Sequence, residues 1–241
     1  IKEGSVKLLI KQQFSSVDFS SLEEILHAFK QKCLLHSIDS VCFGIAGPVI
    51  RGECSTTNLP WEVSVSGLQD YLGVEKVRLI NDLEATAYGM LYLEEDQFIH
   101  LNPNGHKVDG NRAVIAAGTG LGEAILYYDE EAYHPIGTEG GHTDFAPLSE
   151  QQEGLLQWLK ERYPEHVSYE RVLSGTGIYN IYQFLAQSGF AHEPPSMIRI
   201  PEGKDRSAMV GESALKENDP LCMEALRLFS EIYGAEAGNL A

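Results

Sequence analysis

The chain has 241 residues, of which 43% are hydrophobic and 22% are charged, a composition typical of a folded globular protein. Its formal charge of −17 at pH 7 disfavours binding to nucleic-acid backbones and to anionic membrane surfaces. No apolar run is long enough for a membrane-spanning helix. We therefore expect neither a nucleic-acid nor a membrane partner.

The first third of the chain alternates strand and helix signals. Alternating side chains predict a strand over Val6–Phe14, and Ser20–Ser21 is a typical N-cap for a following helix. The apolar runs Ser40–Ala46 and Lys76–Ile80 predict buried strands. A helix over Leu83–Leu93 is predicted to follow the second run.

The rest of the chain begins with a hairpin signal and becomes helical. Arg112–Ala117 and Glu123–Tyr128 predict two strands joined by the loop GTGLG, and the proline-rich stretch Ala191–Gly203 predicts a loop. Strands that alternate first with helices and then form a hairpin predict an α/β protein with mixed sheets. Helices are predicted over Gln151–Arg162, Ser174–Ser188 and Asp219–Leu240.

Polar and turn residues collect over Glu94–Asp109, where we place the domain boundary. This predicts a small α/β domain over residues 1–93 and a larger one over residues 94–241. The four cysteines form no C-x-x-C pair, which predicts reduced, mostly buried thiols.

The first candidate site is the pair Asn81–Asp82, at the end of a predicted strand. The carboxyl ends of strands line the ligand crevice in open α/β sheets. There a carboxylate can take a proton from a substrate hydroxyl while the neighbouring amide orients it. The alternative is that Asp82 only caps the following helix.

The second candidate is the loop Gly118–Gly122. Glycines can present backbone N–H groups to an anion such as a phosphate, because no Cβ stands in the way. A strand follows the loop instead of a helix, so it is not a dinucleotide-binding fingerprint. The alternative is a hairpin turn whose glycines need positive φ angles.

Two further segments carry carboxylates. Glu139 and His142, with Asp144 close behind, can converge on vicinal sugar hydroxyls, which both donate and accept hydrogen bonds. The alternatives are a metal site, for which no cysteine lies nearby, and a plain glycine-rich turn. Glu170, just before a predicted helix, is by itself typical of a surface residue.

Taken in order, these segments resemble the bacterial-type glucokinases of the sugar kinase/Hsp70/actin superfamily. The resemblance extends over nearly the whole chain with the family's spacing. The matching stretches are FGIAGPV (43–49), TNLPW (57–61), LINDLEATAYGM (79–90), AAGTGLGEAIL (116–126), IGTEGGHTDFAPLSE (136–150), ERVLSGTGIYNIY (170–182) and AGNLA (237–241).

The resemblance implies a two-domain, actin-like (ribonuclease H-like) fold with a cleft between the domains. It implies transfer of the γ-phosphoryl group of ATP to the 6-hydroxyl of glucose, with Mg²⁺ as the cofactor of ATP and no protein-bound metal of its own. A cytoplasmic homodimer is the family's usual form. By resemblance, Asp82 is the general base. The implied glucose ligands are Asn81, Asp82, Glu139, His142 and Glu170, and the implied ATP-binding residues are Gly118, Thr119 and Gly120.

The chain departs from the family pattern in three places. It lacks the family's N-terminal Asp-x-Gly-Gly-Thr loop and the glycine-rich segment that follows AGNLA, so we expect a fragment without phosphoryl transfer of its own. Glu123 follows the GTGLG loop, where the family more usually has a small or apolar residue, which predicts a carboxylate near the phosphates. The rival interpretations are a hexose kinase for mannose, N-acetylglucosamine or fructose, and a catalytically silent sugar-binding regulator.

Overall fold

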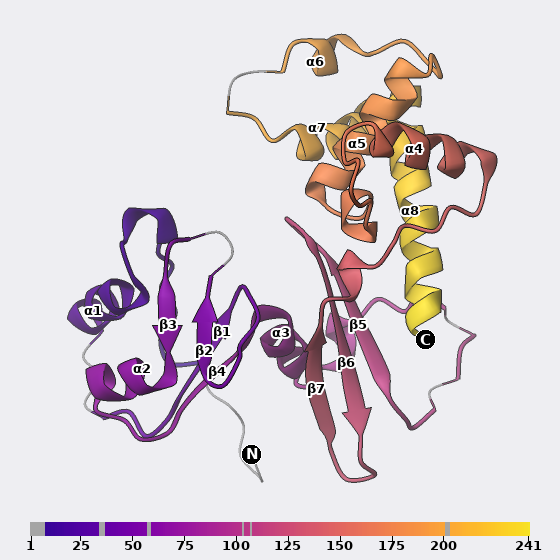
Figure 1. Cartoon of the computed structure of the whole chain (residues 1–241). Helices are drawn as coiled ribbons and strands as arrows, with labels where there is room; N and C mark the ends of the chain where they lie inside the picture. Colours follow the sequence, from indigo (N-terminus) through magenta and orange to yellow (C-terminus); the bar gives the residue numbers. More distant parts are fainter. Residues whose placement is uncertain (1–7, 34–36, 57–58, 103, 107, 201–202) are drawn as a thin grey trace. The chain divides into compact units, whose positions relative to one another are not determined.

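The computed structural model describes residues 8–33, 37–56, 59–102, 104–106, 108–200 and 203–241. The chain forms two compact units, Ile1–Glu95 and Asp96–Ala241 (Figure 1). Both units combine helices with β-sheet, as the sequence predicts. None of the helices in these described ranges is long and apolar enough to cross a membrane.

The first unit holds two small sheets. β1 (Val41–Ile45) pairs in parallel with β4 (Val77–Asn81), and β2 (Glu53–Ser55) pairs antiparallel with β3 (Glu62–Ser64). The predicted strands over 40–46 and 76–80 are thus confirmed. The helices and 3₁₀ turns of this unit are η1 (Ser16–Asp18), α1 (Leu22–Lys32), α2 (Val65–Leu72) and α3 (Asp82–Met90), and η2 (Glu95–Gln97) spans the boundary to the second unit.

Helix α1 begins where the sequence predicts. The hydroxyl of Ser21 accepts the N–H of Glu24, and the Glu24 carboxylate in turn accepts the N–H of Ser20. These bonds satisfy two backbone donors at the first turn, where no helical carbonyl is available to accept them. The apolar side of α1 packs on the core of this unit, which consists of Ile45, Cys54, Trp61, Val63, Leu68 and Leu79.

The strand predicted over Val6–Phe14 is wrong for its described part, Leu8–Phe14, and Val6 and Lys7 lie outside the described residues. Leu8 and Leu9 are largely exposed. Alternating side chains give a strand only when a neighbouring strand takes up the backbone N–H and C=O groups. Among the described residues no strand pairs with this segment, and only Phe14 is anchored, edge to face on Phe19.

The second unit is built on a three-stranded antiparallel sheet of β5 (Arg112–Ala117), β6 (Leu121–Tyr128) and β7 (Tyr133–Thr138). The predicted hairpin is confirmed, although β6 begins two residues earlier than expected. Leu121 and Gly122 pair with Ala117 and Ala116, which shortens the connecting turn to Gly118–Gly120.

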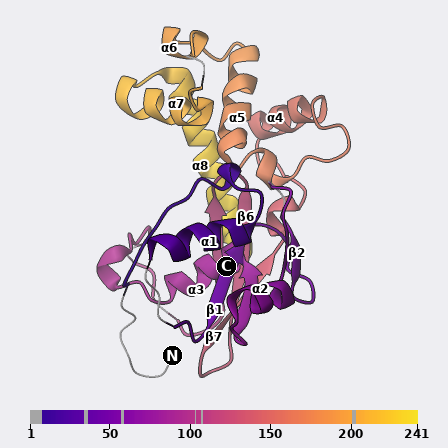
Figure 2. The ribbon, with the colours of Figure 1, turned by 90° about the vertical axis from the view of Figure 1, so that its left-hand side faces the viewer.

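Helices α4 to α7 gather beyond one end of this sheet, while α8 runs alongside it (Figures 1 and 2). The predicted starts of α5 and α8 are confirmed, with Ser174 and Asp219 as their N-caps. The loop predicted over Ala191–Gly203 is wrong in part, because Pro195 opens a short helix there at a position that needs no N–H donor. The elements are η3 (Gly140–His142), α4 (Glu150–Lys160), η4 (Tyr169–Arg171), α5 (Gly175–Gln187), α6 (Pro195–Ile198), α7 (Arg206–Glu212), the π-helical turn η5 (Ser213–Glu217) and α8 (Pro220–Leu240).

Candidate active site

The junction between β4 and α3 carries the pair Asn81–Asp82. The Asn81 Oδ1 accepts the N–H groups of Leu83 at 2.9 Å and Glu84 at 3.3 Å, so Asn81 is the N-cap of α3. Its Nδ2 donates to the Gly47 carbonyl at 3.3 Å, which ties the end of β4 to the end of β1. The capping role that could have explained Asp82 therefore belongs to its neighbour.

Asp82 is the first residue of α3, and its side chain is exposed. Its Oδ1 accepts the adjacent N–H of Leu83 at 2.9 Å, and within the described ranges its Oδ2 has no hydrogen-bond partner. A carboxylate so placed has an oxygen available for a ligand hydroxyl.

The hairpin turn Gly118–Gly120 closes with the N–H of Gly118 donating to the carbonyl of Gly120 at 2.8 Å. None of the glycines in this turn has a positive φ angle, so the explanation of the turn by positive φ is wrong. Position 120 needs a glycine for another reason, which is that a side chain from another segment lies close to its Cα. The Glu170 carboxylate occupies the space that a Cβ at position 120 would need. Around Gly118 that space is open, and Gly118 and Thr119 are exposed.

Glu170 lies in η4 and reaches back to this hairpin. Its Oε2 accepts the N–H of Leu121 at 3.1 Å. The start of α5 fixes the same turn, since the N–H of Gly175 donates to the Gly118 carbonyl at 2.8 Å. Its position in the sequence, before a predicted helix, is typical of a surface residue. In the structure Glu170 is instead half-buried against the candidate phosphate loop.

Glu139 and His142 lie in one tight turn at the end of β7. The N–H of His142 donates to the Glu139 carbonyl at 3.0 Å, and the His142 Nε2 lies 3.8 Å from the Glu139 Oε2. Both side chains are exposed, at 58% for His142 and 68% for Glu139. The turn therefore offers a carboxylate and an imidazole to the same ligand.

The Glu139–His142 turn and the Glu170 segment lie against each other and share Leu121 as a neighbour. Gly141 packs so closely on the Leu121 carbonyl that a Cβ would collide with it. The N–H of Tyr169, next to Glu170, donates to the Thr143 carbonyl at 3.0 Å. Three segments far apart in the sequence thus meet around the beginning of β6.

A polar hollow of about 420 Å³ opens beside His142. Sequence reasoning missed most of it, because its residues carry no motif. Asp144 points its carboxylate to His166 at 3.0 Å, and the guanidinium of Arg171 stacks on Tyr163 at 4.3 Å. The hollow is lined by His142, Arg162, Tyr163, Pro164, Glu165, His166, Ser168 and Arg171.

Glu123 is not where the sequence predicts. It is 2% exposed and faces the interior instead of the surface of the turn. Leu121 and Glu123 share one face of β6 because side chains alternate along a strand, and that face is covered near the turn. Burial, with a smaller effect of the Glu236 charge, raises the pKa of Glu123.

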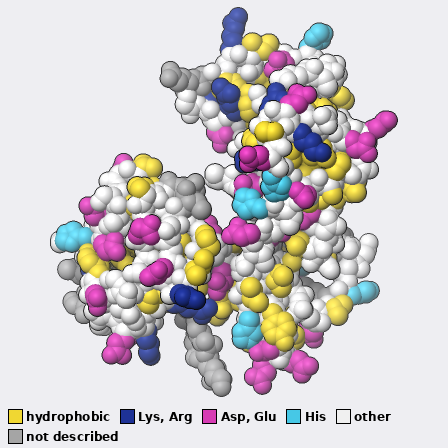
Figure 3. Space-filling view, viewed as in Figure 1, with side chains coloured by type: hydrophobic (Ala, Val, Ile, Leu, Met, Phe, Trp, Pro, Cys, Tyr) yellow, Lys and Arg dark blue, Asp and Glu magenta, His cyan; other side chains and the backbone are white. Residues whose placement is uncertain are grey.

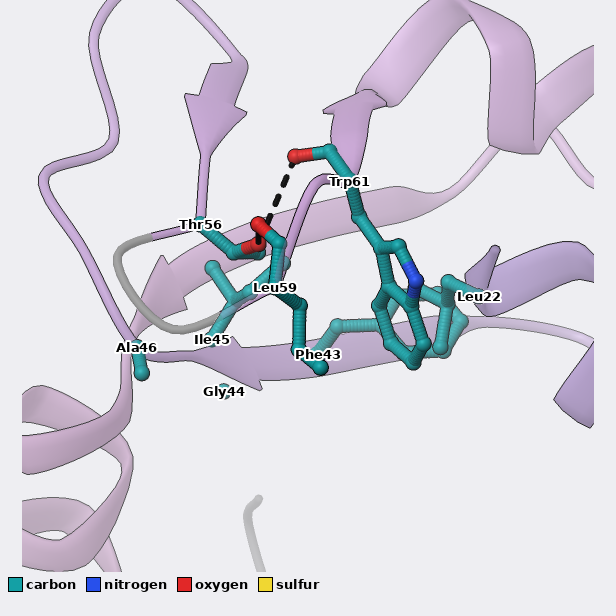
Figure 4. Close-up of a pocket in the computed structure, with 8 residues that line it drawn as sticks. All are labelled: Leu22, Phe43, Gly44, Ile45, Ala46, Thr56, Leu59 and Trp61. Carbon is teal, nitrogen blue, oxygen red and sulfur yellow. Dashed lines mark hydrogen bonds between the residues drawn. The ribbon is translucent and has the colours of Figure 1, made fainter. Parts of the chain in front are cut away.

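The first unit has an apolar hollow of about 200 Å³ beside β1 (Figure 4). Thr56 closes one side, and its hydroxyl donates to the Leu59 carbonyl at 2.6 Å. None of the candidate site residues lines this hollow, and its apolar wall is unsuited to a polyol. Two residues of the TNLPW stretch, Thr57 and Asn58, lie outside the described residues. The lining residues are Leu22, Phe43, Gly44, Ile45, Ala46, Thr56, Leu59 and Trp61.

Acidic side chains are scattered over the visible face in Figure 3. Across the residues that the structure describes, no group of three or more His, Cys, Asp and Glu side chains is arranged to hold a metal ion.

Comparison with known proteins gives the family. The sequence model of the glucokinase family matches residues 2–241. The glucokinase of Nostoc punctiforme is 36% identical over 245 residues, which cover 97% of this chain and 72% of that protein. The glucokinase of Synechocystis is 37% identical, with 97% and 71% covered.

Solved structures of glucokinases also match this chain. The crystal structure of a glucokinase from an Antarctic psychrotroph matches with a TM-score of 0.76 and 29% identity, over 95% of this chain and 68% of that one. A Balamuthia mandrillaris glucokinase solved with glucose shares the fold, with a TM-score of 0.67 and 22% identity over 86% of this chain and 61% of that one. The chain therefore belongs to the glucokinase family, the ATP-dependent kinases of glucose.

Proposed function

We propose that Asp82 is the general base of a glucokinase reaction, in which the γ-phosphoryl group of ATP passes to the 6-hydroxyl of glucose. The observation that carries the proposal is that the two neighbouring residues at the β4–α3 junction have different roles. Asn81 caps the helix, so the exposed carboxylate of Asp82 is left for a ligand.

In this reaction the 6-hydroxyl oxygen forms a bond to the γ-phosphorus while the bond from that phosphorus to the bridging oxygen of ADP breaks. Asp82 accepts the hydroxyl proton. Among the described residues, Gly47 takes one N–H of the Asn81 Nδ2, and the second N–H would orient the same hydroxyl. Phosphoryl transfer needs mainly positioning and charge neutralisation, so few protein groups suffice.

Sugar recognition is assigned to Glu139, His142 and Glu170 together with the Asn81–Asp82 pair. The arrangement of the last three in the second unit supports this, because one turn presents Glu139 and His142 and hydrogen bonds hold the Glu170 segment beside it. Glu170 keeps its Oε1 for a sugar hydroxyl while its Oε2 accepts the Leu121 N–H.

The exposed turn Gly118–Gly120 is assigned to the phosphates of ATP. Open space beside Gly118 and the exposed backbone of Thr119 fit an anion that backbone N–H groups would bind. Mg²⁺ would bind mainly to phosphate oxygens and water and would supply charge neutralisation. The binding of MgATP is therefore compatible with the described residues, among which no group of three or more His, Cys, Asp and Glu side chains could hold a metal ion.

The remaining proposals rest on the family resemblance. They are the actin-like fold of two domains, over residues 1–93 and 94–241 with a cleft between them, and a homodimer in the cytoplasm. Sedimentation equilibrium of the purified protein would test the dimer, and small-angle scattering with and without glucose would test closure of a cleft.

The test of the function combines binding with turnover on the full-length protein. Titration calorimetry with glucose is expected to give binding that Glu139→Gln weakens, and a coupled assay is expected to give ATP-dependent turnover that Asp82→Asn removes. Mannose, N-acetylglucosamine and fructose are the competing sugars. Tighter binding of one of them would reassign the substrate, and sugar binding without turnover would indicate a silent regulator.

A further inference from the structure

Two carboxyl groups are buried together beneath the Glu139–His142 turn. Glu123 in β6 is 2% exposed and Glu236 in α8 is 5% exposed. Acidic side chains are almost never this buried unless they are paired with a cation or bonded to donors. Within the described part of the chain, the Oε1 of Glu123 has no hydrogen-bond partner at all.

Glu123 is in contact with the turn through its side chain. Its Oε2 lies against Gly140, in the space that a Cβ would take. Its backbone is connected to the same residue, since the Thr138 hydroxyl donates to the Glu123 carbonyl at 3.0 Å and accepts the N–H of Gly140 at 3.2 Å. Glu123 thus packs against Gly140, the first of the two glycines between Glu139 and His142.

Glu236 lies close enough to both Glu123 and Tyr169 for its charge to act on the pKa of each. The Asn239 Nδ2 donates to the Glu236 Oε2 at 3.0 Å. After burial, the charge of Glu236 and a hydrogen bond to it are the next largest reasons that the pKa of Tyr169 is raised. Tyr169 immediately precedes Glu170, so α8 meets both sugar-binding segments at this carboxyl pair.

We propose that Glu123, backed by Glu236, is a positioning residue that holds the Glu139–His142 turn in its sugar-binding shape. The inference rests on the sugar role of Glu139 and His142 in the proposed function. Glu123 itself touches no substrate, because its carboxyl group is enclosed between β6, the Gly140 turn and α8.

The fit of Glu123 against Gly140 depends on whether its carboxyl group is charged. Burial first, and then the charge of Glu236, raises the pKa of Glu123 above its ordinary value. Two tyrosines lie on the surrounding elements of the described chain. Tyr169 from η4 interacts with Glu236, and Tyr233 from α8 donates its hydroxyl to the carbonyl of Ile115, which pairs with Glu123 in the sheet. No Lys, Arg or His among the described residues acts on the pKa of Glu123.

The pH dependence of glucose binding is expected to have a definite sign. A neutral Glu123 carboxyl group can stay in this enclosed space. As the pH rises through the raised pKa of Glu123, a buried charge forms there, which both burial and the nearby Glu236 oppose. Glu123 must then move away from Gly140, and the turn loosens. Glucose affinity is therefore expected to fall as the pH rises through this pKa.

The test measures glucose dissociation constants by calorimetry across pH on the full-length protein. Glu123→Gln, an uncharged side chain of the same size, is expected to keep near-normal affinity and to lose the fall in affinity with rising pH. Glu123→Ala is expected to weaken glucose binding about tenfold at every pH, with ATP affinity little changed. Glu131→Gln, at an exposed position in the turn between β6 and β7, is the matched control and is expected to keep the wild-type profile.

Infrared spectroscopy gives a readout that does not depend on activity. A carboxyl band that disappears as the pH rises through the raised pKa of Glu123 is expected in the wild type and not in Glu123→Gln, and this holds even if Glu123→Ala fails to fold. The inference is overturned if Glu123→Gln shows the wild-type pH profile or if no such band is lost. If Glu139→Gln also leaves glucose binding unchanged, the proposed sugar site itself is wrong.

Discussion

The carboxylate of Glu170 accepts the backbone N–H of Leu121 at 3.1 Å across 49 residues of sequence. This bond joins a proposed sugar ligand to the first residue after the proposed phosphate turn. A substitution in the turn should therefore alter the affinity for glucose, and the glycines of the turn offer a way to test this.

Gly120→Ala is expected to raise the KM for glucose about tenfold, because the new methyl group displaces the Glu170 carboxylate and breaks its charge-assisted bond to Leu121. Thermal stability should change little, since the displaced group is the end of a flexible side chain. Steady-state kinetics and calorimetric unfolding measure the two effects. Gly118→Ala is the matched control for the sugar effect, because nothing lies within reach of its added methyl group. An equal glucose effect at both positions would contradict the coupling.

Asp82→Asn is expected to lower turnover by roughly 10²- to 10⁴-fold, the usual contribution of a positioned base, and to leave glucose binding within about tenfold. Its stability should change by less than about 0.5 kcal/mol, because the cap of α3 is Asn81. Asn81→Ala, by contrast, should destabilise the protein by about 1 kcal/mol through loss of the cap. Near-normal turnover of Asp82→Asn would exclude the base role.

Glu139→Gln and His142→Ala are each expected to raise the KM for glucose by ten- to a hundredfold and the KM for ATP much less. The reason is that losing a charged hydrogen-bond partner costs about 1.5–3 kcal/mol. His166→Ala is the control, since His166 lines the same hollow but is bonded to Asp144. If the variants lose stability while glucose KM stays constant, the two residues are structural.

Gly141→Ala is expected to destabilise the protein by about 1–3 kcal/mol, because the methyl group would meet the backbone carbonyl of Leu121, which cannot swing aside. Gly234→Ala, at an exposed position inside α8 with open space around it, should instead stabilise the protein by about 0.5–1 kcal/mol. Denaturant unfolding of both variants measures the two changes in the free energy of unfolding. If both changes have the same sign, the prediction is wrong.

Thiol reagents are expected to modify Cys42 alone in the native protein. Cys42 is the exposed cysteine, whereas Cys33, Cys54 and Cys222 are buried. Burial, and next a hydrogen bond to Asp219, raises the pKa of Cys222 to about 12, so its reactive thiolate hardly forms at neutral pH. Mass spectrometry should find one modified cysteine before denaturation and none in Cys42→Ser. Early modification of Cys222 would show that α8 opens readily.

Much of the local structure could be predicted from the sequence. Ser21, Ser174 and Asp219 cap helices where their patterns predict, because a cap needs only a side-chain oxygen and an N–H three residues away. The hairpin of β5 and β6 was predictable for the same reason, since its bonds join residues close in sequence. The segment Leu8–Phe14 shows the limit, because a strand also needs a partner that sequence does not supply.

The amino-acid sequence by itself determined the family, since seven short stretches with the right spacing identify it without any contact being known. Only the tertiary structure decided what the individual carboxylates do. Asn81 takes the cap because β4 ends there, Glu170 meets the hairpin turn, and Glu123 is buried beneath the Gly140 turn. These relations depend on backbone atoms and faces of strands brought together across dozens of residues, and such long-range packing leaves no periodic signal in the chain.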